Sequence, residues 1–161
     1  MTLKNSVLLL MVTVLFFSCD KKRVFDEYKT IGKVWNKDSI VSFKFKQEDT
    51  TSVYNLFVNL RNNDAYPFNN LFLIVSLEQP DGFTEVDTLE YQMAKPDGSL
   101  LGSGFSDVKE SKLWFKEKQK FPIKGDYQVH IQQAVRQTGK VAGVKDLEGV
   151  TEVGFRIESI E

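Results

Sequence analysis

Apolar and polar side chains alternate with a period of two residues through most of the chain after residue 39, and this alternation restricts the possible folds more than any other feature. The clearest example runs from Val41 to Lys46, where three apolar residues alternate with three polar ones. Residues 54–60, 127–132 and 153–158 repeat the pattern. Because successive side chains of a strand point to opposite faces, these segments are predicted to be half-buried strands.

Polar and glycine-containing segments separate the predicted strands. Pro80-Asp81-Gly82 and Pro96-Asp97-Gly98 are turn sequences that bracket a strand at 86–93, and residues 47–52 are polar enough to close a hairpin. Residues 61–70 contain four Asn, one Asp and one Pro, which predicts a loop.

These elements predict an all-β fold. About seven strands, with no amphipathic helix long enough to connect parallel strands, are typical of an antiparallel β-sandwich, immunoglobulin-like or jelly-roll-like. The chain contains 13 Phe, 5 Tyr and 2 Trp, which pack well on pleated surfaces and suit such a core. We expect one sandwich domain over residues 39–161.

The first 18 residues are predicted to be a helical export signal. A short region with Lys4 precedes an apolar run over residues 7–17, which is shorter than a membrane-spanning helix and within the length of a signal peptide. Ser18 and Cys19 follow, as lipoprotein signal peptidase requires. We therefore expect cleavage after residue 18 and a lipid on Cys19, which anchors the mature chain to a membrane.

Residues 19–38 lack clean periodicity and are predicted to be the lipidated N-terminus and a tether. Asp20-Lys21-Lys22-Arg23 places three basic residues beside the lipid, against anionic head groups or simply in water. Because this tether begins basic rather than with the acidic cluster of surface-exported lipoproteins, we predict a periplasm-facing lipoprotein. Asp20 directly after the cysteine would favour the inner membrane under enterobacterial sorting rules, but we expect the outer membrane.

The residues that carry chemistry argue against an enzyme. His130 is the only histidine and Cys19 the only cysteine, so neither a paired-histidine zinc site nor an intramolecular disulfide is possible. His130 alternates with apolar neighbours and is expected on an outer strand face without a catalytic task. The net charge of −1 excludes the basic field that non-specific nucleic-acid binding needs. We expect no catalytic residues, no cofactor and no metal. The sequence does not show how the loop carboxylates are arranged in space, so a carboxylate pair for glycoside hydrolysis and a calcium site remain alternatives.

Three aromatic residues are candidates for contact with a ligand or a partner: Trp35, Trp114 and Phe115. On the surface of a sandwich they would stack on sugar rings or contact another protein, whereas core packing is the competing interpretation. Together with the Asn-rich loop, they motivate an alternative function, a module that binds envelope glycans.

Ordered strings along the mature chain resemble the gliding-motility lipoprotein GldH family of Bacteroidetes. The strings are Cys19-Asp20-Lys21, Val24-Phe25-Asp26-Glu27-Tyr28, Tyr54 to Asn62, Tyr66 to Phe72, Asp87 to Tyr91, Met93 to Gly98, Gly102 to Phe105, Lys112 to Phe115 and Leu147 to Glu158. The resemblance implies a non-enzymatic cell-envelope lipoprotein needed for gliding, in organisms where gliding is tied to type IX secretion. It also implies contacts with other envelope proteins of that machinery, and it assigns no catalytic residue.

Overall fold

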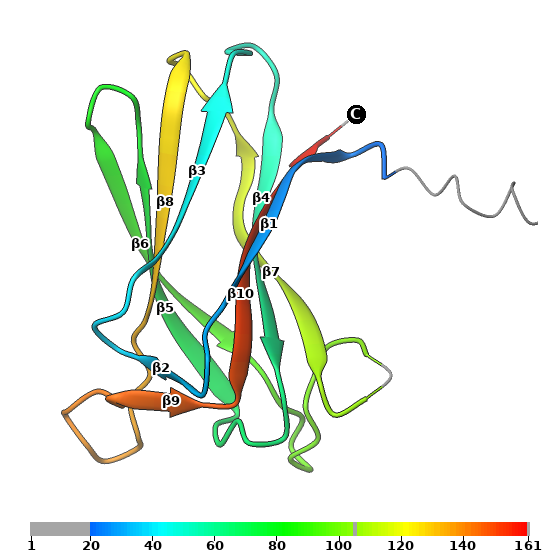
Figure 1. Ribbon diagram of the computed structural model, residues 1–161, viewed down its shortest axis with the longest axis vertical. Helices are drawn as coiled ribbons and strands as arrows, with labels where there is room; N and C mark the ends of the chain where they lie inside the picture. Colours follow the sequence, from blue (N-terminus) through cyan, green and yellow to red (C-terminus); the bar gives the residue numbers. More distant parts are fainter. Residues whose placement is uncertain (1–19, 105, 161) are drawn as a thin grey trace, which may run out of the picture.

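The computed structural model describes residues 20–104 and 106–160, and these form an antiparallel β-sandwich (Figure 1). The described strands are β1 (Arg23–Thr30), β2 (Val34–Asn36), β3 (Val41–Gln47), β4 (Tyr54–Asn62), β5 (Asn70–Glu78), β6 (Thr84–Gln92), β7 (Lys109–Gln119), β8 (Gly125–Gln133), β9 (Asp146–Glu148) and β10 (Val150–Ser159). The predicted signal peptide and Cys19 lie outside the described residues.

Two four-stranded antiparallel sheets make up the sandwich. The first, called the β10 sheet here, has the order β1-β10-β4-β7, and the second, the β5 sheet, has the order β3-β8-β5-β6. The short strands β2 and β9 pair with each other beside them. The prediction of an all-β antiparallel sandwich is confirmed.

Period-two alternation produces the core, as the sequence predicts. In β5 and β8 every second residue is buried and the residues between are partly exposed. Aromatic side chains join the two sheets: the Phe45 ring of β3 stacks on Phe155 of β10 at 5.9 Å, and within its own sheet it stacks on Tyr127 of β8 at 5.6 Å. Buried apolar area of this kind is the dominant favourable contribution to folding.

The tether prediction needs correction. Residues 23–30 form β1, which pairs with β10 along its length, and residues 34–36 form β2. Phe25 of β1 packs on the core rings of Phe45 and Phe155, 5.6 Å and 6.1 Å away. The sandwich therefore begins 16 residues before residue 39, and only residues 20–22 of the described chain precede it.

The predicted hairpin at residues 47–52 is also wrong. The strands on either side, β3 and β4, belong to different sheets, so this segment crosses from one layer to the other. In contrast, Pro80-Asp81-Gly82 does turn between the paired strands β5 and β6, with Gly82 at a φ of +86°.

The two ends of the sandwich differ. The ends of the described chain lie in the same half of the sandwich as the β3–β4, β5–β6 and β7–β8 connections, called the terminal end here, and at the far end lie β2, β9 and the longer loops (Figure 1). Within the described ranges, no helix has the length and apolar character needed to cross a membrane.

Candidate functional site

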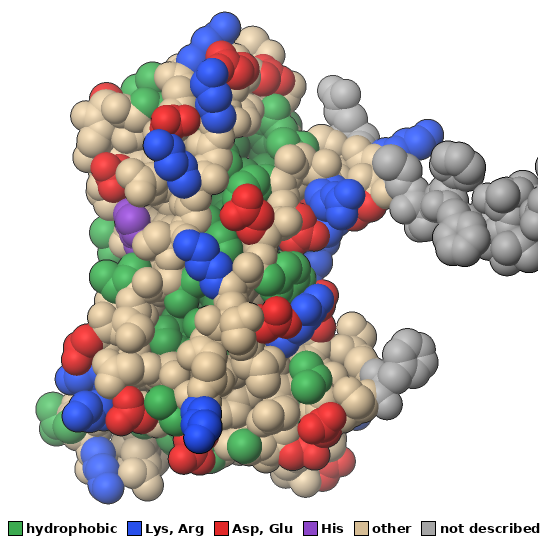
Figure 2. Space-filling model, in the orientation of Figure 1, with side chains coloured by type: hydrophobic (Ala, Val, Ile, Leu, Met, Phe, Trp, Pro, Cys, Tyr) green, Lys and Arg blue, Asp and Glu red, His purple; other side chains and the backbone are tan. Residues whose placement is uncertain are grey.

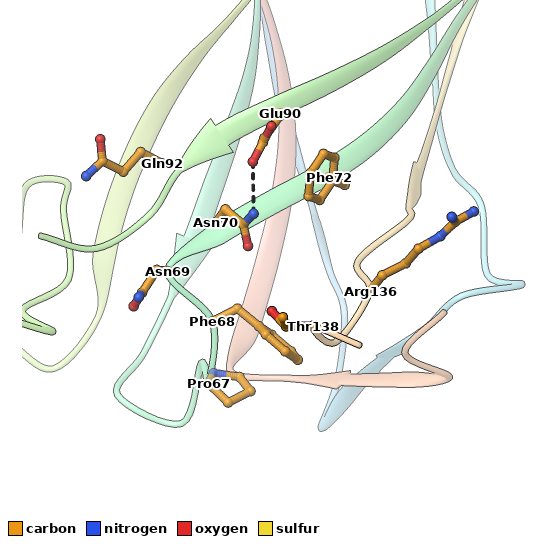
Figure 3. Close-up of a pocket in the computed structure, with 9 residues that line it drawn as sticks. All are labelled: Pro67, Phe68, Asn69, Asn70, Phe72, Glu90, Gln92, Arg136 and Thr138. Atoms are coloured by element: carbon orange, nitrogen blue, oxygen red, sulfur yellow. Dashed lines mark hydrogen bonds between the residues drawn. The ribbon is translucent and has the colours of Figure 1, made fainter. Parts of the chain in front are cut away.

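A surface groove lies at the far end, against the outer face of the β5 sheet. It has a volume of about 800 Å³ and combines the β4–β5 loop, the adjoining ends of β5 and β6, and the β8–β9 loop. Its lining residues are Pro67, Phe68, Asn69, Asn70, Phe72, Glu90, Gln92, Arg136 and Thr138 (Figure 3). The Asn-rich loop that the sequence predicts therefore forms one wall.

Tyr66 fixes the shape of this loop. Its side chain is buried, and its hydroxyl donates a hydrogen bond to the carbonyl of Asn70 at 2.7 Å. Gly149, at a φ of +81°, allows the backbone of Tyr66 to approach, since a Cβ there would lie 2.2 Å from the Tyr66 nitrogen. Phe68 packs partly on the core, with its ring edge-on to Tyr66 at 6.2 Å. The wall is thus held by packing rather than free to rearrange.

The floor of the groove is polar and flanked by two phenylalanine rings. The Asn70 side-chain amide donates to the Glu90 carboxylate across the β5–β6 pair at 2.9 Å, and Phe68 and Phe72 lie on either side of Asn70 (Figure 3). The guanidinium of Arg136 points away from this amide–carboxylate pair (Figure 3). Amides, one carboxylate and two apolar rings suit a neutral, hydroxyl-rich ligand better than a strongly charged one.

The three aromatic residues singled out in the sequence do not meet in one site. Trp35 is 1% exposed and its indole N–H donates to the carbonyl of Ser39 at 3.0 Å, so it belongs to the core. Phe115 faces inward and is also buried. Trp114 is 48% exposed on β7, where it covers the Phe57 ring at a centroid distance of 4.4 Å. Of the three, only Trp114 is available to a partner.

Sequence reasoning missed an ordered network on the outer face of the β10 sheet. Arg61 of β4 donates to Glu110 of β7 and Glu152 of β10, both at 2.6 Å, and its guanidinium stacks on the Tyr28 ring at 4.4 Å. The Asn59 amide donates to the Tyr28 hydroxyl at 2.9 Å. Cross-strand pairs of this kind stabilise a sheet face.

Titration behaviour reflects this network. Burial raises the pKa of Tyr28 to about 12, and the carboxylates of Glu110 and Asp26 add to the rise. Hydrogen bonds to Glu152 and Glu110 raise the pKa of Arg61 above its usual value. Both groups therefore keep their usual protonation states throughout the physiological range.

His130 lies on the outer face of the β5 sheet, where the sequence predicts it. Its Nδ1 is 2.7 Å from the Ser42 hydroxyl oxygen, and its Nε2 is 3.4 Å from the Glu78 carboxylate. Ser42, His130 and Glu78 lie on the adjacent strands β3, β8 and β5. Ser42 is paired with His130 on one side, and Ser76, two residues before Glu78, is paired with His130 on the other. The arrangement is a cross-strand hydrogen-bond ladder. Among the residues that the structure describes, no group of three His, Cys, Asp or Glu side chains is arranged to hold a metal ion.

Comparison with known proteins identifies the family. The model of the GldH lipoprotein family matches residues 23–157. The chain belongs to the GldH lipoprotein family. It is 65% identical over 158 residues to a protein named gliding motility lipoprotein GldH from Flavobacterium johnsoniae, a match that covers 98% of each chain. A GldH homolog from Christiangramia forsetii is 57% identical over 145 residues, which are 90% of this chain and 89% of that one.

As a member of the GldH family, the chain is a lipoprotein and is lipid-anchored in a membrane. The family match begins at Arg23, the first residue of β1, so it takes in the strand that the sequence pattern alone assigned to a tether.

Solved structures give only distant likenesses. The VP2 subviral particle of infectious bursal disease virus matches 88% of this chain and 34% of its own at 12% identity and a TM-score of 0.40. A family GH115 4-O-methyl-α-glucuronidase matches 89% of this chain and 18% of its own at 16% identity and a TM-score of 0.42. The chain thus spans about a third or less of these proteins, and at such scores the likenesses carry nothing about function.

Proposed function

We propose that this protein is a non-enzymatic component of the cell envelope that is required for gliding motility, anchored by a lipid on Cys19. Its sandwich acts through contacts with proteins of the gliding and type IX secretion machinery. The observation that carries the proposal is the 65% identity, over 98% of both chains, to the gliding motility lipoprotein of Flavobacterium johnsoniae. Identity at this level extends over the whole sandwich rather than a single motif.

The outer edge of the β10 sheet supplies a surface for such contacts. Trp114 is 48% exposed on the edge strand β7, and Phe57 lies beneath it. The Lys112 ammonium lies over the same Phe57 ring at 4.0 Å. An exposed indole with an adjacent cation is typical of the residues that dominate binding at protein interfaces.

Genetic deletion tests the motility role. We expect cells without the gene to stop spreading on agar and to secrete less adhesin, and the wild-type gene to restore both. Spreading that is unchanged in a gliding host would contradict the role in motility.

A photo-crosslinking amino acid at position 114 tests the contact surface in the complemented strain. Crosslinked products that contain motility or secretion proteins support the surface. The matched control places the crosslinker at Ile40, which is 57% exposed and lies before β3. Identical products from both positions would contradict a specific contact at Trp114.

We place the anchored protein in the outer membrane, facing the periplasm. The basic segment after Cys19 supports the periplasmic facing. External protease added to intact cells should leave the protein whole, and its loss there would reverse the orientation.

A second candidate function is binding of an envelope glycan, and the far-end groove favours it. Asn70, Glu90 and Gln92 offer hydrogen-bonding groups in a groove that also holds the rings of Phe68 and Phe72, a combination that suits sugar hydroxyls and the apolar face of a sugar ring. Trp35 and Phe115 take no part, since both are buried.

Titration calorimetry with oligosaccharides from cell-wall and exopolysaccharide preparations tests this candidate. We expect Phe72→Ala to weaken binding at least tenfold. Ile74→Ala is the matched control, because Ile74 lies two residues farther along the same face of β5 and outside the groove lining. Absence of heat with every preparation would remove the glycan function.

A further inference from the structure

The chain between the proposed lipid site and the first strand is short and held in place. Three residues separate Cys19 from β1. The Asp20 carboxylate pairs with the guanidinium of Arg156 in β10. The backbone N–H of Ser159 donates to the carbonyl of Lys22 at 2.8 Å. The described part of this linker is therefore docked on the sandwich.

A docked linker limits how far the sandwich can stand from its anchor. Consecutive Cα atoms are about 3.8 Å apart, so the residue that carries the acyl chains lies only that far from the docked Asp20. A bilayer that holds those chains must come close to the terminal end. A sandwich held away from the membrane would need a longer, free linker, which this chain lacks after residue 19.

Apolar side chains are exposed at the terminal end. Val24 is 51% exposed and Ile160 is 38% exposed, and both line a groove of about 540 Å³ beside the start of β4. Phe83, in the β5–β6 turn at the same end, is 59% exposed. Exposed aromatic and aliphatic side chains at one end of a domain favour the boundary between lipid head groups and acyl chains.

Basic residues lie beside these apolar ones. Lys21, Lys22 and Arg23 are exposed, and none of them forms a salt bridge with another of the described residues. Figure 2 shows Lys and Arg side chains gathered where the described chain begins. Charges that are free of protein partners remain available to lipid phosphates.

We infer that the terminal end of the sandwich rests on the bilayer that holds the lipid. Val24, Phe83 and Ile160 lie at head-group level, and the basic linker contacts anionic phosphates. The far end, with its groove, then points away from the membrane. This inference rests on the proposed lipidation of Cys19.

Fluorescent labels at two positions of the lipidated protein test the arrangement. Ile160→Cys and Phe83→Cys, each in the otherwise wild-type chain, take an environment-sensitive dye after the protein enters vesicles of phosphatidylethanolamine and phosphatidylglycerol. We expect blue-shifted emission at both positions and at least twofold quenching by lipids that carry a nitroxide near the head group. The control is Val141→Cys, a residue 91% exposed in the β8–β9 loop at the far end, whose label should stay in water.

Two outcomes would overturn the inference. Labels at 160 and 83 that remain as water-exposed as the label at 141 would show a sandwich held off the bilayer, and a response at 160 without one at 83 would contradict end-on contact. A Gly/Ser insert of about 12 residues after Cys19, with a span of roughly 20 Å, should reduce both responses. Flotation of the vesicles reports lipidation separately, so failure of the anchor and failure of the contact are distinguishable.

Discussion

The ring of Tyr28 in β1 lies across Gly154 in β10, on the outer face of the sheet. The two residues are paired in the strand register, and a Cβ at Gly154 would be 2.8 Å from ring carbons of Tyr28. This close approach lets the ring reach Arg61 and Asn59 on β4, the strand beyond β10. The first strand is thereby tied to two neighbours although it pairs with only one.

We predict that Gly154→Ala destabilises the protein by about 1–3 kcal/mol, because the added methyl group displaces the ring and disturbs the contacts it makes. Urea unfolding followed by circular dichroism measures the change. Gly143→Ala is the control, since its Cβ would meet only the Val135 carbonyl at an ordinary 3.6 Å. Equal stabilities for the two variants would contradict the role of the ring.

We predict that the stabilising effect of Tyr28 is lost in alkali. Its pKa is about 12 in the folded protein and 10.0 in the unfolded chain. A raised folded-state pKa contributes stability that is complete below pH 10 and falls as the pH rises toward 12, since the unfolded chain loses the proton first. The free energy of unfolding of wild type and Tyr28→Phe should therefore converge over this interval. A constant difference would show that the pKa of Tyr28 is not raised.

The two tryptophans should report opposite environments. Trp114→Phe leaves Trp35, which is buried, so its emission should be blue-shifted and resist quenching by acrylamide. Trp35→Phe leaves the half-exposed Trp114, which acrylamide should quench efficiently. Replacement by alanine should cost about 3–5 kcal/mol at Trp35, because a large core cavity opens, and far less at Trp114. Comparable losses at both positions would contradict the burial described for Trp35.

We predict that Cys19→Ala removes the lipid anchor and abolishes the function in spreading. Without the thiol no diacylglycerol can be attached, so the product is soluble or keeps its signal. Cell fractionation and spreading on agar measure the two effects. The control is Ser18→Ala, which retains a small residue before the cysteine and should behave as wild type. Membrane association of a Cys19→Ala product that has lost its signal peptide would require another anchor.

Strands that have one solvated face were predictable from sequence, because burial of the other face imposes alternation. Residues 41–47 and 125–133 are such strands, and their buried positions follow the pattern. β1 was not predictable in this way. It is an edge strand with an irregularity between Arg23 and Phe25, and its outward residues Asp26 and Tyr28 are partly buried by side chains of neighbouring strands. The alternation of apolar and polar residues is lost when neighbouring side chains also cover the outward face of a strand.

The assignment of strands to sheets was beyond the sequence. β3 and β4 alternate in the same way, and nothing in residues 47–52 distinguishes a hairpin from a crossing between layers. For the groove, composition identified the Asn-rich loop, whereas Glu90 and Gln92 come from a strand about 20 residues away that only the register brings alongside. Trp35 was misleading as a contact candidate, because an isolated indole carries no sequence signal that separates core from surface.

The pairing of the first strand with the last also determines how the molecule carries a load. β1 leaves the membrane-proximal linker and runs antiparallel to β10 toward the far end. Tension between a lipid anchor and the far end of the sandwich would act along the axis of β1. The backbone hydrogen bonds between β1 and β10 would then be loaded in shear all at once, rather than broken one after another. Under the proposed function, this strand order allows the domain to resist a force that is applied through its lipid anchor.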